Sequence, residues 1–327
     1  MKIAVVGATG LVGSVMLKVL EERGFAKETI IPAASEKSVG KKISFAGKEL
    51  MVVSVQDAIN QNCDYAIFSA GSKASKQYAP LFAEKNTTVI DNSSCWRMDK
   101  NVPLVIPEIN IDAVKQSDRI IANPNCSTIQ MLVALAPLDR EYDIKRIVVS
   151  TYQSVTGTGV KAVQQLASEE KGEQCQMAYT HQIYHNVLPY GGDFLDNGYT
   201  TEEEKLVNET KKILAKPEIK VTAMVARVPV VGGHSESVNI EFSKPYELKN
   251  IFSLLENTKG ITVLDEPSKH IYPMPIISEG KDDVFVGRLR RDNTVESGLN
   301  LWVVADNLRK GAATNAIQIM EALIARR

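Results

Sequence analysis

The sequence predicts an α/β protein: a doubly wound parallel sheet at the N-terminal side, followed by an α+β part with a mixed sheet. Up to residue 125, short apolar strands alternate with helical patterns, which is typical of an open parallel sheet. A glycine-rich turn, Gly7–Gly13, separates the first strand from the first helix. Beyond residue 126, long alternating segments follow one another with few helices, which indicates a mostly antiparallel or mixed sheet.

The composition is that of an ordinary two-domain protein. The 327 residues are 44% hydrophobic, and domains usually take roughly 100–200 residues each. The net charge of −1, with acids and bases interspersed, gives no reason to expect a nucleic acid or a membrane surface as partner. We expect neither a signal peptide nor a membrane span, since the chain begins in a strand and its apolar runs are short.

The cysteine pattern favours a reducing compartment. Cys63, Cys95, Cys126 and Cys175 are scattered without a CxxC pair, which argues against a disulfide framework and against a zinc site. We therefore expect no metal and a cytoplasmic location, where a free thiol can serve as a nucleophile.

The first strand and helix surround a dinucleotide-binding fingerprint. Lys2–Val6 is a short apolar strand that runs directly into the glycine-rich turn. In this context Gly7 and Gly10 let the backbone approach a pyrophosphate, and Gly13 allows close packing of helix on strand. The pyrophosphate would lie on the helix N-terminus. The alternative is a tight turn that binds nothing.

The loop after the second strand, Ile30–Ala34, bears on the choice of cofactor. Ser35, Lys37 and Ser38 are suited to a 2′-phosphate and favour NADP. Glu36 could instead hold the ribose hydroxyl of NAD, so both cofactors remain open. A polar loop without a ligand is the further alternative.

The remaining elements of the first part continue the alternation of strands and helices. Strands are predicted at 48–53, 65–68, 88–91, 103–107 and 120–121, and helices at 57–60 and 75–85. The loop after residues 88–91 carries Arg97, which suits a phosphate or a carboxylate, although a plain surface arginine is the alternative.

The stretch Asn123–Thr128 places a cysteine at the start of a helix. Cys126 precedes the apolar helical run Ile129–Leu138. The partial positive charge of a helix N-terminus favours a thiolate, and the free amides there could bind an oxyanion. The alternative is that Cys126 is a small buried hydrophobe.

The second part is predicted to be rich in strands. Strands are expected at 145–153, 220–231, 236–243, 284–289 and 299–305, and helices at 201–214 and 307–327. Residues 169–197 show little periodicity and are predicted to form an irregular excursion. The last helix is expected to pack back on the first domain.

A thiol nucleophile needs a proton partner. The candidates are His181, His185, His234 and His270. His234 follows a glycine pair between two strands, and Arg227 ends the preceding strand, so the two side chains could converge on one pocket. A packed or surface histidine is the alternative. A dinucleotide fold with an activated cysteine and a histidine indicates an oxidoreductase that forms a thioester from an aldehyde.

These motifs together resemble the bacterial aspartate-β-semialdehyde dehydrogenase family. The matching segments run in order through nearly the whole chain: Gly7–Gly13, Asn92–Arg97, Asn123–Thr128, Ser150–Gln153, Glu202–Lys205, Arg227–Glu236, Phe285–Arg288 and Trp302–Leu308. The resemblance implies a Rossmann-type NADP-binding domain over 1–126, with the helix at about 307–327 packed on it. It implies a catalytic and dimerisation domain over 127–306, and a homodimer or a tetramer of dimers.

The resemblance also implies the reaction. It is the reversible, NADPH-dependent reductive dephosphorylation of L-4-aspartyl phosphate to L-aspartate 4-semialdehyde and phosphate, through a cysteine thioester. The family serves lysine, diaminopimelate, threonine and methionine biosynthesis. By this resemblance Cys126 is the nucleophile, His234 the acid/base, Gln153 the residue that orients the substrate, and Asn125 a support for the oxyanion.

Binding roles follow from the same resemblance. Arg227 is expected to bind the substrate carboxylate and Glu202 its amino group, while Arg97 and Lys205 hold the inorganic phosphate. The expected NADP contacts are Gly7, Thr9, Gly10, Leu11, Val12, Gly13, Ser35, Lys37, Ser38, Thr156, Gly157 and Asn307.

Two rival interpretations remain at this stage. The N-acetyl-γ-glutamyl-phosphate reductases share the architecture and the chemistry, but usually have glycine where this chain has Asn125. A non-catalytic dinucleotide sensor would use the same fold, although the set of Cys126, His234, Arg227 and Arg97 argues against it. Cys95, close to the expected phosphate loop, departs from the family pattern, and its role stays open.

Overall fold

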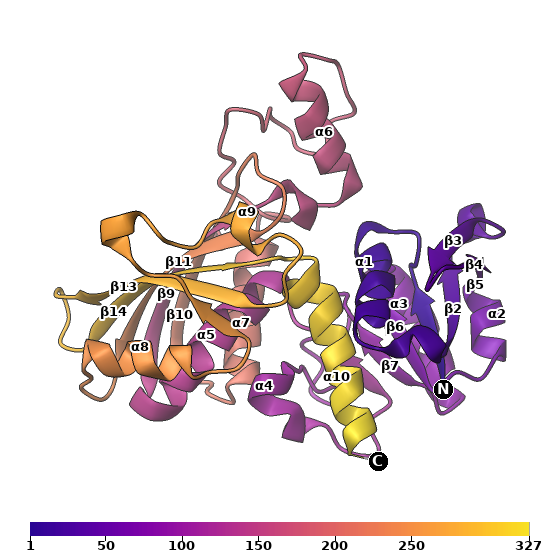
Figure 1. Ribbon diagram of the computed structural model, residues 1–327, viewed down its shortest axis with the longest axis horizontal. Coiled ribbons are helices and arrows are strands. Elements are labelled where there is room, and N and C mark those ends of the chain that lie inside the picture. The colour runs from indigo at the N-terminus through magenta and orange to yellow at the C-terminus, as the bar shows by residue number, and fades with distance from the viewer. Residues whose placement is uncertain (327) are drawn as a thin grey trace. The chain divides into compact units, whose positions relative to one another are not determined.

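The computed structural model describes residues 1–326 and divides into two compact units. Unit 1 is Met1–Asn125 together with the segment from Ala312 onward, and unit 2 is Cys126–Gly311. Compared with the expected domains 1–126 and 127–306, Cys126 falls in unit 2, and that unit extends to Gly311. Figure 1 labels many of the elements of both units.

Unit 1 is built on a parallel sheet with the strand order β5-β2-β1-β6-β7-β8. Its strands are β1 (Lys2–Val6), β2 (Thr29–Ala34), β5 (Val53–Ser54), β6 (Tyr65–Phe68), β7 (Thr88–Asp91) and β8 (Ile120–Ala122). The chain leaves β1 toward β2 and later returns to β6 on the other side of β1. This reversal is the point at which doubly wound sheets bind ligands beyond the carboxyl ends of the strands.

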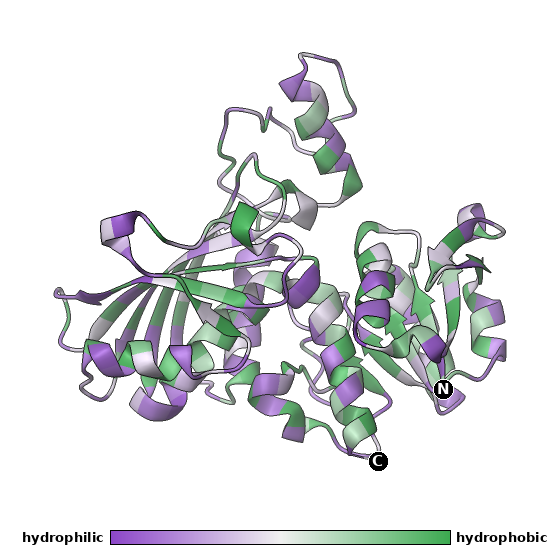
Figure 2. Ribbon diagram, in the orientation of Figure 1, coloured by the Kyte–Doolittle hydropathy of each residue, from purple (hydrophilic) through white to green (hydrophobic). Residues whose placement is uncertain are grey.

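Helices cover both faces of this sheet. They are α1 (Leu11–Glu22), α2 (Val55–Asn60), α3 (Ser72–Glu84), α4 (Pro107–Asn110) and α10 (Thr314–Ala325). Alternate residues of each strand point to opposite faces of the sheet and contribute to two cores. In one core Ile3 packs with Met16 of α1 and Ile319 of α10, and in the other Ala4 packs with residues of α2 and α3 such as Phe82. The strands are therefore apolar on both faces, as the green colour in Figure 2 shows.

Unit 2 contains a second six-stranded sheet, with the order β10-β9-β11-β14-β13-β12. Its strands are β9 (Ile144–Gln153), β10 (Lys220–Arg227), β11 (His234–Phe242), β12 (Ile261–Val263), β13 (Val284–Asp292) and β14 (Gly298–Ala305). The pairs β9/β10 and β12/β13 are parallel and the others antiparallel, so the predicted mixed sheet is confirmed.

The helices of unit 2 cover mainly one face of its sheet, and we call the other its open face. They are α5 (Cys126–Tyr142), α6 (Val160–Glu170), α7 (Thr201–Ile213), α8 (Leu248–Glu256) and α9 (Pro275–Ser278). Helix α5 is buried without interruption from Ser127 to Asp139 and contacts β9, β11, β13 and β14. Helices α7 and α8 lie on the same side (Figure 1). Figure 2 shows the alternating polar and apolar bands that such a half-covered sheet requires.

The structure departs from the sequence-based expectations in several places. The strand expected at 48–53 is divided between β4 (Lys48–Met51), which forms a hairpin with β3 (Lys42–Phe45), and β5. The strand expected at 103–107 is only a bridge between Leu104 and Ala122, because Pro103 has no amide to donate and Pro107 begins α4.

Two helical segments also differ from the prediction. Helix α6 was not expected, and it precedes the irregular excursion, whose main-chain amides are held by the side chains of Gln165 and Glu169. The predicted final helix begins as a π-helix at Arg309–Ala313 before α10. None of the helices within residues 1–326 is long and apolar enough to cross a membrane.

Candidate active site

The glycine-rich turn of unit 1 forms a cradle that only glycine can form. Gly7 has a φ of +91°, and a Cβ there would collide with the carbonyl oxygen of Ser69 at the end of β6. A Cβ on Gly13 would collide with the carbonyl oxygen of Gly7. Helix α1 begins at Leu11 with Gly10 as its N-cap, so no side chain caps its first amides. This arrangement fits the pyrophosphate of a dinucleotide.

The loop after β2 lies beside this turn. The Gly7 amide donates to the Ala33 carbonyl at 2.8 Å, and the Thr9 hydroxyl donates to Ser38 Oγ at 3.4 Å. Ser38 is buried, whereas Glu36 and Lys37 are exposed. The structure therefore joins Ser38 to the glycine turn through Thr9, and it leaves both charged side chains of this loop exposed to solvent.

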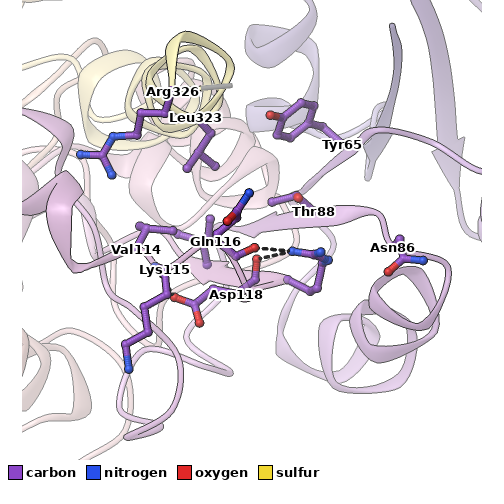
Figure 3. A pocket seen from close by; sticks show the side chains of 11 residues that line it. Tyr65, Asn86, Thr88, Val114, Lys115, Gln116, Asp118, Leu323 and Arg326 are labelled. Atoms are coloured by element: carbon purple, nitrogen blue, oxygen red, sulfur yellow. Dashed lines mark hydrogen bonds between the residues drawn. The ribbon is translucent and has the colours of Figure 1, made fainter.

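A separate hollow of about 570 Å³ lies at the amino ends of strands of the same sheet, opposite to the glycine turn (Figure 3). Tyr65 and Thr88, the first residues of β6 and β7, contribute to its lining. The Arg119 guanidinium donates to the Gln116 and Asp118 carbonyls at 2.8 and 3.4 Å, so the main chain already engages this cation. Because the glycine turn follows the carboxyl end of β1, this hollow is not the cofactor cradle.

The loop that leads to the cysteine is braced by hydrogen bonds within unit 1. The Asn123 side chain donates to Asn92 Oδ1 at 2.7 Å and accepts from Asn315 Nδ2 of α10 at 2.7 Å. Arg97 is buried, and its guanidinium donates to the Asn123 and Asn92 carbonyls, each at 2.9 Å. Arg97 thus lies against the loop that ends at Asn125, with part of its fork used on the main chain.

Cys126 is the first residue of α5, is half-buried, and forms no disulfide within residues 1–326. A Cβ built on Gly311 would lie 2.9 Å from Cys126 Cβ and 3.6 Å from Asn307 Cβ. Glycine at position 311 therefore lets this segment lie closely against the Cα and Cβ of Cys126.

His234 is the first residue of β11 and is fully buried. Its Nδ1 accepts a hydrogen bond from the Ser154 amide at 3.0 Å. This bond assigns the ring proton to Nε2, which has no hydrogen-bond partner within residues 1–326. Burial and the nearby Arg227 guanidinium lower the pKa of His234 to about 3. The ring is therefore a neutral imidazole that presents an Nε2–H donor.

Arg227 and His234 converge on Gly157. A Cβ on Gly157 would lie 2.7 Å from Arg227 Nη1 and 2.9 Å from His234 Nε2. The two side chains can therefore face one common space only because residue 157 has no side chain. Arg227 is buried at the end of β10, and its Nη1 approaches the Ser154 carbonyl at 3.5 Å.

Glu202 stands close enough to His234 to favour its protonated form electrostatically. It lies in the first turn of α7, which begins with a capping box between Thr200 and Glu203. Lys205, one turn later, binds Glu202 Oε2 at 2.7 Å. The residues expected to hold the substrate ammonium and the phosphate thus form an ion pair with each other.

Gln153 ends β9 and is fully buried. It lies in register with Arg227 of β10, and its Nε2 donates to Ser127 Oγ at 3.0 Å. Its Oε1 has no hydrogen-bond partner within residues 1–326 and can accept a bond from a ligand. Gln153 is thus joined to α5 one residue after Cys126.

Two residues of unit 2 that are expected to contact NADP, Thr156 and Asn307, are joined by a hydrogen bond. Thr156 Oγ1 donates to Asn307 Oδ1 at 3.0 Å, and Ser154 Oγ approaches the same atom at 3.2 Å. Through Ser154 this group is linked to His234. In the described part of the chain, residues 1–326, no cluster of His, Cys, Asp or Glu side chains could hold a metal ion.

Several residues near the site were not expected from the sequence. Ser154 and Gly311 act through main-chain and packing contacts that carry no sequence signal. Gln130 could have been noticed, since it interrupts an apolar run one turn after Cys126. Glu236 could have been noticed as well, because it alternates with His234 on one face of a strand.

Comparison with protein families assigns both units. Residues 2–117 match the model for the semialdehyde dehydrogenase NAD binding domain. Residues 135–310 match the model for the semialdehyde dehydrogenase dimerisation domain. Both assignments agree with the folds described above.

Individual relatives cover nearly the whole chain. An aspartate-semialdehyde dehydrogenase of Aquifex aeolicus is 50% identical over 99% of this chain and 98% of its own length. The Bacillus subtilis enzyme is 45% identical over 98% of this chain and 96% of its own length.

Solved structures agree with this result. The crystal structure of aspartate semialdehyde dehydrogenase II from Vibrio cholerae has a TM-score of 0.95 and 45% identity, covering 99% of this chain and 98% of that one. The Vibrio cholerae enzyme complexed with ASA has a TM-score of 0.94 and 44% identity, with the same coverage. The chain belongs to the aspartate-semialdehyde dehydrogenases, oxidoreductases of amino-acid biosynthesis.

Proposed function

We propose that this enzyme catalyses the NADPH-dependent reductive dephosphorylation of L-4-aspartyl phosphate to L-aspartate 4-semialdehyde and phosphate. The observation that carries this proposal is the convergence of His234 and Arg227 on Gly157, with Glu202 beside them. A proton donor, a carboxylate-binding fork and an acidic group for an ammonium suit an amino-acid substrate that reacts at its side chain.

The proposed chemistry begins at Cys126. Its thiolate sulfur attacks the acyl carbon, the bond from that carbon to the phosphate oxygen breaks, and inorganic phosphate leaves a thioester. Bound NADPH would supply the hydride that reduces this thioester. The carbon–sulfur bond then breaks, which releases the aldehyde and restores the thiolate.

His234 and Gln153 act on the oxygen and the orientation of the acyl group. Because His234 presents an Nε2–H, it is suited to donate a hydrogen bond to the oxygen that becomes negative in the tetrahedral intermediates. Asn125, next to the nucleophile in the chain, would support the same oxygen. Gln153 Oε1 would accept a bond from the substrate and fix its position.

Arg227 and Glu202 would bind the amino-acid end of the substrate. A guanidinium fork matches a carboxylate in two hydrogen bonds, and Glu202 supplies the charge that an ammonium needs. Lys205 and Arg97 would bind the phosphate, a role for two cations. Since Lys205 already pairs with Glu202, substrate binding would redistribute this pair between ammonium and phosphate.

NADP is the proposed cofactor. The cradle residues Gly7, Gly10 and Gly13 fit a pyrophosphate, and Ser35, Lys37 and Ser38 favour a 2′-phosphate. Further proposed contacts are Thr9, Leu11, Val12, Thr156, Gly157 and Asn307. We also propose a cytoplasmic location, where the four free thiols remain reduced.

We propose that the open face of the unit 2 sheet joins a second copy of the chain. Tyr152 and Trp302 pack there as a tilted pair with ring centroids 5.5 Å apart, and Met224 is 55% exposed. Large exposed apolar side chains on one face mark an association site. The match to a dimerisation domain supports a homodimer or a tetramer of dimers.

Replacement of the nucleophile separates catalysis from cofactor binding. We expect Cys126→Ala to reduce kcat by about 10⁴-fold or more, because the thioester cannot form. Cys175→Ala, which changes another half-buried free thiol, is the matched control and should retain activity. Fluorescence titration of Cys126→Ala should show NADPH binding as in the wild type, and tighter than NADH. Full turnover in Cys126→Ala would refute the mechanism.

The buried histidine should make the protein acid-sensitive. Below the unfolded pKa of 6.5 the unfolded chain takes up a proton that the folded ring binds only near pH 3, so stability falls as pH decreases across this interval. We expect urea denaturation of His234→Gln to depend less on pH there than that of the wild type. The exposed His270→Gln variant is the control. Equal acid dependence of His234→Gln and the wild type would contradict a neutral imidazole.

Substitution of Arg227 tests whether its guanidinium binds the substrate carboxylate. Arg227→Lys keeps the charge but loses the bidentate geometry, so KM for aspartate semialdehyde should rise by about tenfold or more. Arg146→Lys alters an arginine of the same sheet that contacts Asn239, and it should leave KM unchanged. An unaltered KM in Arg227→Lys would show that Arg227 does not bind the carboxylate.

The dimer proposal is tested by sedimentation velocity. We expect Met224→Glu to raise the dimer dissociation constant by about tenfold or more, since it buries a charge in an apolar interface. Met51→Glu, at a 62% exposed position of unit 1, serves as control. If Met224→Glu sediments as the wild type does, the second copy binds elsewhere.

A further inference from the structure

A buried carboxyl group lies beneath the proposed catalytic residues of unit 2. Glu236 is the third residue of β11 and therefore points to the same face of the sheet as His234. It is fully buried, as are Gln130 and Ser127 of α5. The catalytic scheme assigns Glu236 no role.

Among residues 1–326, no cationic side chain forms an ion pair with Glu236. Its neighbours across the sheet are Thr151 and Val303, and its side chain faces the neutral Gln130 and Ser127. Within residues 1–326, neither carboxyl oxygen makes a hydrogen bond of normal geometry. An ionised carboxylate would be strongly disfavoured in such a place. Burial accordingly raises the pKa of Glu236 well above its ordinary value.

The two neighbours of Glu236 each hold a residue of the site. Gln130 Nε2 donates to the His234 carbonyl at 3.2 Å. Ser127 Oγ accepts from Gln153 Nε2 at 3.0 Å. Glu236 is thus placed between two branches, one that reaches the main chain of the histidine and one that reaches the side chain of the glutamine.

We propose that Glu236 is a neutral carboxylic acid and a positioning residue, which fixes Gln130 and Ser127 and through them His234 and Gln153. A protonated carboxyl group offers one donor and one acceptor, which is what a buried amide and a buried hydroxyl can both use. The proposal rests on the roles given above to His234 and Gln153.

This assignment distinguishes three variants. Glu236→Gln keeps a donor and an acceptor at nearly the same volume, and it should retain kcat within about threefold. Glu236→Leu leaves Gln130 and Ser127 without this partner, and it should lower kcat by about tenfold or more. The effect on KM should be smaller than that on kcat, because His234 and Gln153 act on the reacting carbonyl. Glu247→Gln, at an exposed carboxylate of unit 2 that pairs with Lys249, is the control.

The pH dependence of kcat and the infrared spectrum test whether the carboxyl group of Glu236 is charged. The pH profile of kcat for Glu236→Gln should superimpose on that of the wild type, since no charge has been removed. The infrared difference spectrum between wild type and Glu236→Gln at neutral pH should contain the carbonyl band of a protonated carboxylic acid. If that band is absent, or if Glu236→Gln is as impaired as Glu236→Leu, the carboxyl group acts as a charge and the proposal is wrong.

A double variant tests the route through Gln130. Gln130→Leu should lower kcat as Glu236→Leu does, and the two effects should not add in the double variant. Additive losses would overturn the positioning role. The infrared measurement needs neither turnover nor a stable leucine variant. It therefore decides the protonation state of Glu236 even if the proposed reaction itself proved wrong.

Discussion

The hydrogen bond from the Ser154 amide to Nδ1 of His234 sets the chemistry of the site. A main-chain amide can only donate, so the histidine nitrogen that faces it must accept, and the ring proton resides on Nε2. The bond requires that the end of β9 and the start of β11 lie side by side. The antiparallel pairing of these strands and the Gly232-Gly233 turn before His234 provide this arrangement. The neutral ring can therefore donate a hydrogen bond through Nε2–H. Burial and the nearby Arg227 guanidinium keep the ring neutral, because both lower its pKa.

Around this bond, unit 2 places a polar layer inside an otherwise apolar packing. Helix α5 is buried along most of its length against the sheet, yet Ser127 and Gln130 face Gln153 and the strand of His234 rather than apolar side chains. Such networks are costly unless every member finds a partner, and when satisfied they fix one geometry. Through Gln130 and Ser127, the helix that begins at Cys126 is thus joined to the main chain of His234 and to the side chain of Gln153.

In both units, glycines permit close approaches that a side chain would prevent. In unit 1, Gly7 and Gly13 let β1, α1 and the loop after β6 approach closely, main chain against main chain. In unit 2, Gly157 leaves room between Arg227 and His234, and Gly311 lies closely against Cys126. A side chain at any of these positions would collide with its neighbours in the protein.

The sequence by itself determined what depends on local pattern: the parallel sheet of unit 1, the glycine cradle, the mixed sheet of unit 2, and the placement of Cys126 at a helix start. It did not reveal α6, or the short bridge that replaces the strand expected at 103–107, because prolines and weak periodicity obscure both. The tertiary structure alone decided the tautomer of His234, the pairing of Glu202 with Lys205, and the isolation of Glu236. These depend on distances between residues far apart in the chain, and no local pattern encodes such distances.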